Sequence, residues 1–366
     1  MEYKFAELFK WTSGKPVLPS EGNIPIYGSN GVIGYTDTAK YENKIILGRV
    51  GAYCGSVTYC PTKFNATDNT LITTCDTSKI LYYFAYYLLK LYNLNSFAGG
   101  AAQPLITQSI LKKLKCDIPD LNSQRRIASL LSAYDNLIEN NNKRVRLLEQ
   151  MAENLYKEWF AYHRIKDSAK EIQLAEIVSY SRGVSYSSEE IDCVEGNDLI
   201  NLKNIQGYGG FRLDGTKKYD GRYKEEQIVK EGDLIMGVTD MTQDRRTVGS
   251  VALIPNISNL SVISADLIKL TSTIDNVFLY AMFRWGNVSR YISQFANGAN
   301  VLHLKPQVLK NIKVMLPPKG LIDKYVSTVK PMVETINKLN TENENLTRQR
   351  DLLLPRLMSG KLEVKP

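Results

Sequence analysis

The stretch that decides the fold is Phe97-Ala98-Gly99-Gly100-Ala101, which returns as Phe295-Ala296-Asn297-Gly298-Ala299. The second copy lies 198 residues further along (295 minus 97), and Leu111-Lys112-Lys113-Leu114-Lys115 returns at the same shift as Leu309-Lys310-Asn311-Ile312-Lys313. Eight of the 23 aligned positions from 97 to 119 are identical. A long repeat of this kind predicts that the chain holds two copies of one structural unit.

The start of the repeat has a different shift from its rear. Ala6-Glu7-Leu8 matches Ala175-Glu176-Ile177 at a shift of 169 (175 minus 6), whereas Leu155 still matches Leu353 at 198. The front part of the second copy must therefore hold 29 extra residues (198 minus 169). We expect this pattern if the front parts have adapted to different targets.

Short strands separated by glycine-rich turns are predicted in the front part of each copy. Gly48-Arg49-Val50-Gly51 and Gly207-Tyr208-Gly209-Gly210 match neither a P-loop nor a dinucleotide-binding fingerprint, so we interpret them as β-turns. The predicted strands are 44–48, 55–59, 70–73, 233–237, 249–253 and 267–270.

A heptad pattern follows in the rear of each copy. It predicts a long helix from Ser123 to Phe160, about 57 Å in length, and a second helix near the C-terminal end. Pro331 and Pro355 predict that the second helix is kinked or split near 331 and frayed by 355. Since each helix is too long for one domain to cover, we expect the two to pair. The predicted pairing residues are Leu131, Ile138, Leu148, Leu155, Ile336, Leu346 and Leu353.

Composition indicates an ordinary soluble protein of two domains. The 366 residues are 43% hydrophobic and 23% charged, and the net charge of +8 mildly favours an anionic partner. The sequence shows no signal-peptide pattern and no apolar run long enough for a membrane span. Five cysteines without a Cys-x-x-Cys pair argue against a disulfide framework or a zinc site. We therefore expect a cytoplasmic location.

Catalytic motifs are missing from the sequence. The only Pro-Pro pair, Pro317-Pro318, lacks the flanking residues of a DNA methyltransferase motif, and there is no Walker A sequence. No acidic-x-Lys triplet follows Pro119-Asp120 within about 40 residues, as a nuclease would require, and His163 and His303 are the only histidines. We therefore expect no enzyme activity, no catalytic residue and no metal or cofactor site in this chain.

Five stretches follow one another along the chain: Ile24 to Tyr35, Ile46 to Gly51, Gly99 to Pro104, Ile118 to Ile127 and Leu353 to Gly360. In this order they resemble the specificity (S) subunit of type I restriction-modification systems. The resemblance spans the chain and includes the two-copy order. The second copy departs from the pattern where Leu316 to Ile322 lacks a glutamine at the helix entry, and where Val301 replaces the counterpart of Gln103.

The resemblance implies an α+β fold with two β-rich target-recognition domains, each followed by a long helix. The two helices would pack antiparallel with pseudo-two-fold symmetry. The implied boundaries are 1–121 and 163–318 for the domains, and 122–162 and 319–366 for the spacer helices.

The same resemblance implies a sequence-specific subunit that reads a bipartite DNA target and performs no chemistry. Double-stranded DNA, two methyltransferase (M) subunits and motor-nuclease (R) subunits would be its partners, and S-adenosylmethionine, ATP and Mg would bind only to those partner subunits. By residue type, the expected DNA-binding residues are Arg49, Lys63, Asn69, Gln103, Arg182, Lys203, Lys217, Lys218, Arg245, Arg246 and Asn300.

Two other interpretations stay open at the level of sequence. One is the DNA-reading subunit of another split methyltransferase-nuclease or phage-defence system. The other is a coiled-coil scaffold without DNA affinity, which the helices alone would support.

Overall fold

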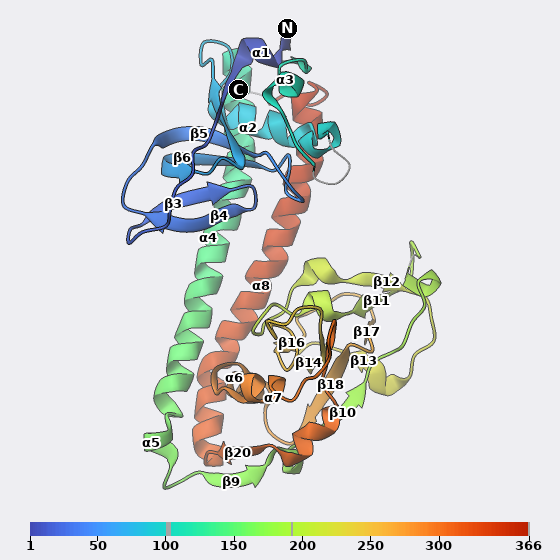
Figure 1. The fold of residues 1–366 in the computed structure, drawn as a ribbon. Coiled ribbons are helices and arrows are strands. Elements are labelled where there is room, and N and C mark those ends of the chain that lie inside the picture. Colours follow the sequence, from blue (N-terminus) through green and yellow to red (C-terminus); the bar gives the residue numbers. More distant parts are fainter. Residues whose placement is uncertain (100–103, 192, 365–366) are drawn as a thin grey trace. The chain divides into compact units, whose positions relative to one another are not determined.

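The computed structural model describes residues 1–99, 104–191 and 193–364 (Figure 1). The chain divides into two compact units. The first comprises residues 1–140 and 342–366, and the second comprises residues 141–341. Each unit therefore contains one β-rich domain and a segment from each of the two long helices, α4 (Leu121–Trp159) and α8 (Lys319–Met358).

The domain of the first unit is built on a six-stranded sheet with the order β2-β7-β5-β6-β3-β4. A two-stranded pair of β1 and β8, and helix α2 (Tyr82–Leu91), complete the domain. The short helical segments are α1 (Phe5–Leu8), η1 (Leu94–Phe97) and α3 (Gln108–Leu111). The strands are β1 (Glu2–Lys4), β2 (Phe9–Ser13), β3 (Ile24–Gly28), β4 (Gly31–Thr36), β5 (Tyr41–Gly48), β6 (Val57–Ala66), β7 (Thr70–Cys75) and β8 (Lys115–Asp117).

The core of the first domain lies between this sheet and the helices. Ile45 and Leu47 alternate with residues that face the other side of β5, as expected for a strand, and both are fully buried beside Phe84 of α2. Leu354 and Leu357 of α8 join the same cluster together with Leu131 of α4. Burial of these apolar side chains fastens both helices to the domain.

The domain of the second unit has two four-stranded sheets, with the orders β10-β18-β14-β16 and β12-β11-β17-β13. Its helices are α5 (Tyr162–Ile165), α6 (Asn276–Trp285) and α7 (Val288–Ser293), with η2 (Leu174–Glu176), η3 (Glu189–Ile191), η4 (Leu202–Asn204), η5 (Leu213–Gly215), η6 (Glu225–Gln227) and η7 (Pro306–Asn311). The strands are β9 (Lys170–Gln173), β10 (Val178–Arg182), β11 (Asn197–Ile200), β12 (Lys217–Tyr219), β13 (Ile228–Val229), β14 (Leu234–Gly237), β15 (Thr239–Asp240), β16 (Val251–Leu253), β17 (Ser261–Ile263), β18 (Leu267–Ser272), β19 (Leu302–His303) and β20 (Lys313–Leu316).

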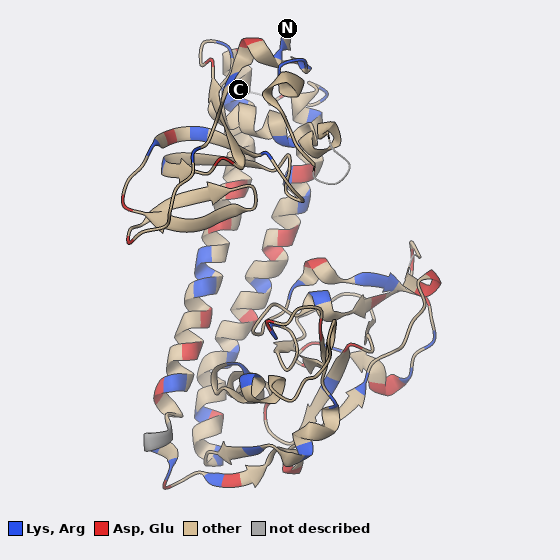
Figure 2. Ribbon diagram, viewed as in Figure 1, with Lys and Arg blue, Asp and Glu red and all other residues tan. Residues whose placement is uncertain are grey.

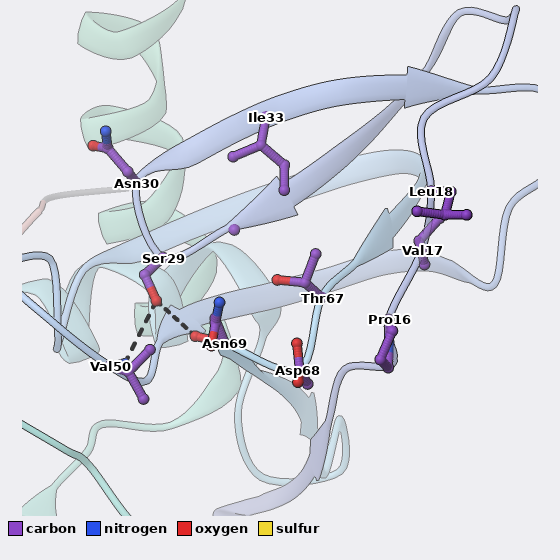
Figure 3. A pocket seen from close by; sticks show the side chains of 11 residues that line it. Pro16, Val17, Leu18, Ser29, Asn30, Ile33, Val50, Thr67, Asp68 and Asn69 are labelled. Carbon is purple, nitrogen blue, oxygen red and sulfur yellow. Dashed lines mark hydrogen bonds between the residues drawn. The ribbon is translucent and has the colours of Figure 1, made fainter.

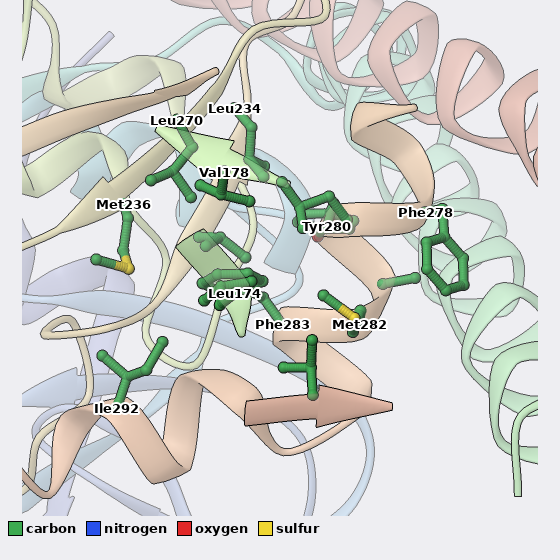
Figure 4. Close-up of a cluster of buried hydrophobic side chains, with 14 of the residues drawn as sticks. Leu174, Val178, Leu234, Met236, Leu270, Phe278, Tyr280, Met282, Phe283 and Ile292 are labelled. Atoms are coloured by element: carbon green, nitrogen blue, oxygen red, sulfur yellow. The ribbon is translucent and has the colours of Figure 1, made fainter. Parts of the chain in front are cut away.

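A large apolar core joins these parts of the second unit (Figure 4). It includes Phe278 and Phe283 of α6, which are fully buried. Tyr325 of α8 packs edge-on against Phe278, and its hydroxyl donates a hydrogen bond to the carbonyl oxygen of Ala152 on α4 at 3.1 Å. Within this unit, the two long helices are thus bound to each other and to the domain.

Strand pairing confirms the internal repeat. The order β2-β7-β5-β6 in the first sheet matches β10-β18-β14-β16 in the second domain. The terminal pairs are also equivalent, because Tyr3 lies opposite Cys116 and Ile172 lies opposite Val314. These partners are related by the two shifts found in the sequence, 169 (172 minus 3) and 198 (314 minus 116).

Pairing also locates most of the 29 extra residues. Phe9 of β2 corresponds to Val178 of β10, a shift of 169, whereas Gly48 of β5 corresponds to Gly237 of β14, a shift of 189. Twenty extra residues (189 minus 169) therefore lie between these strands. β11 pairs in parallel with β17 and antiparallel with β12, as β3 does with β6 and β4, so β11 and β12 correspond to β3 and β4. Ten of the extra residues lie between β11 and β12, because Ile26 corresponds to Leu199 (a shift of 173) and Gly34 to Lys217 (a shift of 183). The divergence of the front part thus lies mainly in longer connections between equivalent strands.

The predicted split of the second long helix near 331, and its fraying by 355, were wrong. It is helical from Lys319 to Met358 without interruption, although Pro331 and Pro355 lie inside it. Each proline removes one backbone hydrogen bond, at a cost of about 3 kcal/mol. Burial of Val329 in the core of the second unit stabilises the helix on the N-terminal side of Pro331. Burial of Leu357 in the core of the first unit stabilises it on the C-terminal side of Pro355.

The first long helix begins at Leu121, two residues earlier than expected, because Asp120 caps it. The Asp120 carboxylate accepts hydrogen bonds from the backbone N–H groups of Asn122 and Ser123 at 2.9 and 3.1 Å. These bonds, together with one from the Ser123 hydroxyl, hold the pKa of Asp120 below its usual value. An aspartate at this position satisfies backbone donors that the first helical turn leaves free.

Candidate nucleic-acid interface

A cluster of loops at one end of the first domain brings together two of the expected DNA-binding residues. The backbone N–H of Arg49, just after β5, donates to the carbonyl oxygen of Asn69 at 2.9 Å. The Ser29 hydroxyl donates to the same oxygen at 2.6 Å and accepts from the Val50 N–H at 3.5 Å (Figure 3). Three separate turns thus converge on one carbonyl group.

A hollow of about 440 Å³ opens beside these loops (Figure 3). Its polar wall carries the side chains of Asn30 and Asn69, which are exposed, and its apolar wall carries Leu18 and Ile33. Leu18 and Ile33 are 87% and 54% exposed. Free amides can pair with base edges, and exposed aliphatic groups can contact a thymine methyl group. Sequence analysis missed Ser29 and Asn30, although both lie in the stretch that resembles the family.

The described residues on either side of 100–103, the stretch that contains Gln103, lie beside Arg49. The N–H of Ile106 donates to the Arg49 carbonyl oxygen at 3.0 Å, and the N–H of Gly51 donates to that of Pro104 at 3.0 Å. Gly99 and Leu105 bond to each other across the base of the loop. Gln103, which was expected to bind DNA, lies outside the described residues.

Lys63 does not belong to this cluster. It lies on β6 opposite Glu42 of β5, whereas Arg49 follows the other end of β5. Six residues separate Glu42 from Gly48, which corresponds to about 20 Å along a strand. Exposed Lys63 can therefore serve only a separate contact.

The second domain builds an equivalent cluster. The Leu304 N–H donates to the Val238 carbonyl oxygen at 2.8 Å, in the same place as the bond between Ile106 and Arg49. The side-chain amide of Gln243 donates to the Ala299 carbonyl oxygen at 3.0 Å. The loop that carries Arg245 and Arg246 therefore lies against the loop that carries Asn300.

Asp240 organises the first of these loops from inside. Its carboxylate accepts hydrogen bonds from the backbone N–H groups of Thr242 at 2.8 Å and Thr247 at 2.7 Å. Burial favours the neutral form of this carboxyl group, but the hydrogen bonds from Thr247 and Thr242 hold its pKa below the usual value. The buried aspartate thus acts as a fixed acceptor that shapes the loop that carries Arg245 and Arg246.

The other expected cations of the second domain lie on elements other than the loop after β15. Lys217 and Lys218 lie on β12, which Figure 2 shows as a basic strand. Lys218 is engaged in an ion pair with Asp198 at 2.8 Å. Exposed Lys203 lies in η4, and exposed Arg182 ends β10.

The predicted helix-pairing residues all lie on α4 or α8 and none is exposed. Leu131 is fully buried in the first core, and the other six are partly buried. An unpredicted ionic contact lies among them in the first unit, where Arg350 of α8 pairs with Asp135 of α4. Asp135 also accepts a hydrogen bond from the Tyr87 hydroxyl of α2 at 2.6 Å.

In the part of the chain that the structure describes, no group of three histidine, cysteine or acidic residues could hold a metal ion. Among the same residues, no helix has both the length and the apolar character needed to cross a membrane.

The chain contains two copies of one α+β domain, and each copy has a loop cluster and is joined to the long helices. This arrangement defines a binding protein with two equivalent domains. The chain belongs to the family described as type I restriction modification DNA specificity domain, which matches residues 2–150 and 166–348. It is therefore assigned to the type I specificity subunits, as the resemblance in sequence predicted.

Individual relatives agree with this assignment. The chain is 25% identical over 326 residues to the type I restriction enzyme MjaIX specificity subunit of Methanocaldococcus jannaschii, covering 77% of this chain and 69% of that protein. It is 23% identical over 350 residues to the MjaVIII specificity subunit of the same organism, covering 88% and 80%. The crystal structure of a type I S subunit from M. genitalium has the same fold, with a TM-score of 0.64, 19% identity and coverage of 98% and 95%.

Proposed function

We propose that this chain reads a bipartite DNA target and directs partner subunits to it. Each domain would recognise one half of the target through its loop cluster. The observation that carries the proposal is the equivalence of the two clusters, in which the Arg49 and Val238 carbonyl oxygens anchor corresponding loops. Equivalent readers suit a target made of two separate half-sites, as in dimeric repressors.

The proposal assigns no chemistry to this chain. Adenine methylation would come from two methyltransferase subunits with S-adenosylmethionine, and cleavage from motor-nuclease subunits with ATP and Mg. The chain itself would need no cofactor, and its place of work would be the cytoplasm. The purified chain, shown to be free of partner subunits, should neither methylate nor cut DNA, and either activity would contradict this part of the proposal.

A domain exchange tests bipartite reading. Residues 1–120 are replaced by the matching domain of a relative, and the methylated sites of the assembled complex are mapped across a genome. One half-site should change and the other should stay. As a matched control, the second domain is exchanged in the same way, which should alter the opposite half-site. If either exchange changes both half-sites, the model of two independent readers is wrong.

Binding by the assembled complex tests the scaffold alternative. A DNA-reading subunit should shift a duplex in gel electrophoresis with an affinity that falls as salt rises, because bound phosphates release counterions. The exposed amides of both loop clusters, and exposed Arg246 in the second, favour this result. A complex without measurable affinity for DNA would favour a coiled-coil scaffold instead.

A further inference from the structure

A second hollow, of about 520 Å³, lies in the second domain beside the loop cluster. The loop after β15 and helix α7 contribute to its wall. Of its lining residues, only Arg245 was expected from the sequence to bind DNA. The lining residues that matter here are Tyr208, Arg245, Arg284, Asn287, Ser289 and Arg290.

The hollow carries positive charge that the protein does not neutralise. The Arg284 guanidinium pairs with Glu149 at 2.9 Å, and Asp244, the carboxylate in the wall, pairs with Arg246 at 2.6 Å. Within the described residues, neither the Arg245 nor the Arg290 side chain has an ion pair or hydrogen bond. Two guanidinium groups therefore face a concave surface with their donors free.

Backbone strain is concentrated around the same hollow. Five non-glycine residues in the described chain have a positive φ, and three of these line the hollow. They are Tyr208, Arg245 and Asn287, with φ values of 67°, 55° and 63°. Side chains disfavour this conformation, so such residues gather where the surrounding fold holds a functional geometry. The strain holds Arg245 in the wall of the hollow.

A buried hydroxyl group completes the set. The Ser289 oxygen is inaccessible to solvent and has no hydrogen-bond partner, although this residue lines the hollow. A buried hydroxyl without a partner is unfavourable, and rotation about the Ser289 Cα–Cβ bond would let this hydroxyl donate to a ligand oxygen within the hollow. Two free guanidinium groups and one free hydroxyl are the donors that a phosphate group binds best.

We infer that this hollow is the seat of one backbone phosphate of the DNA bound by the second domain. Arg245 and Arg290 supply the charged donors, and Ser289 supplies the hydroxyl. This inference rests on the proposed DNA-reading function and adds a positioning site to it. Phosphate contacts fix the orientation of a domain on the duplex and carry no sequence information.

The test compares salt dependence in the assembled complex of this chain with its methyltransferase subunits. The variants are Arg290→Ala, Arg245→Gly and the double variant, where glycine accepts the positive φ of position 245 without strain. The affinity for a fluorescent duplex is measured from 50 to 200 mM salt. Loss of one phosphate contact should reduce the slope of log K against log salt by about 0.9 in magnitude.

The double variant decides whether both arginines hold one phosphate. With a shared phosphate, the double variant loses about as much slope as each single variant. A loss of about 1.8 would indicate two phosphates and overturn the single seat. Arg222→Ala is the matched control, because Arg222 is exposed and does not line the hollow. An equal loss of slope in this control would reduce the effect to net charge and overturn the inference.

Two further measurements separate the possible ligands. Ser289→Ala should weaken DNA binding about fivefold to tenfold without lowering the melting temperature, because its hydroxyl has no protein partner. DNA sites that the complex carrying Arg290→Ala selects from a random library should keep the original sequence. A changed sequence would indicate that Arg290 contacts a base and would overturn its assignment to a phosphate. If inorganic phosphate raises the melting temperature while the DNA slopes of all variants stay unchanged, the hollow binds free phosphate and the inference about DNA is wrong.

Failure of this inference is distinguishable from failure of the proposed function. If the wild-type complex binds no DNA, the proposed function itself is wrong. If the wild type binds DNA and both arginine variants retain its salt slope, only the phosphate seat is wrong.

Discussion

The ionic contact between Asp135 and Arg350 predicts a measurable part of the stability of the first unit. Arg350 of α8 and Tyr87 of α2 bind different oxygens of the Asp135 carboxylate on α4. The side chains of Arg350 and Asp135 are only 14% and 29% exposed. Replacing Arg350 with alanine leaves this carboxylate without its cation in a poorly hydrated place.

The expected loss follows from this degree of burial. Removing one partner of a buried ion pair costs about 3 to 5 kcal/mol, whereas an exposed pair contributes about 0.2 to 1 kcal/mol. Because Asp135 keeps some contact with water, we expect Arg350→Ala to lower the free energy of unfolding by about 2 kcal/mol. For a unit of 165 residues (140 plus 25) this corresponds to a melting temperature about 4 to 8 °C lower.

A double-mutant cycle measures the pair itself. Arg350→Ala, Asp135→Ala and the double variant are unfolded in a calorimeter, and the coupling energy should be about 1.5 kcal/mol. The cycle is needed because Arg350 also pairs with exposed Asp351. Lys115→Ala breaks an exposed pair with Glu2, with side chains 57% and 62% exposed, and should cost less than about 0.5 kcal/mol. A coupling energy as small as that control would refute the reasoning.

Three further predictions test other parts of the chain. Gly55→Ala should lower the free energy of unfolding by about 2 to 4 kcal/mol, because its Cβ would lie 2.4 Å from the Asn95 backbone nitrogen. Gly51 also has a positive φ but has open space around it, so Gly51→Ala should lower the free energy of unfolding by only about 1 kcal/mol. Equal losses of stability in thermal unfolding would contradict this reasoning. Burial raises the pKa of the Cys75 thiol to about 12, so above pH 9 the unfolded chain loses this proton before the folded chain does. The free energy of unfolding should therefore fall by about 1.4 kcal/mol per pH unit up to pH 12. Cys75→Ala should show a correspondingly shallower pH dependence of stability, and an unchanged pH dependence would contradict a role of this thiol. Deleting 141–147 together with 339–345 removes one heptad, about 10 Å, from each helix. When binding sites are selected from a library, the gap between the two half-sites should shorten by about three base pairs, or binding at the original gap should weaken sharply. Undiminished binding with the original gap would show that the helices do not set the spacing.

Several features of this protein could be predicted from residue order alone. The repeat was visible because equivalent residues stay in register over a long stretch, and the difference between its two shifts measured the 29 extra residues. Heptad spacing predicted both long helices, since period alone decides which side chains share a helical face. The sheet formed by β11, β12, β13 and β17 was not predicted, because its short strands pair across long separations in sequence.

Tertiary structure decided which side chains meet. Arg49 and Asn69 share one cluster because the turns after β5 and β6 converge, whereas Lys63, nearer to Asn69 in sequence, lies toward the other end of the sheet. Pro331 and Pro355 left α8 intact because packing outweighs the lost backbone hydrogen bonds. Local sequence patterns determine the type and order of the secondary-structure elements. The free hydrogen-bond donors around Ser289 depend instead on contacts between segments that are distant in sequence, and no local pattern contains these contacts.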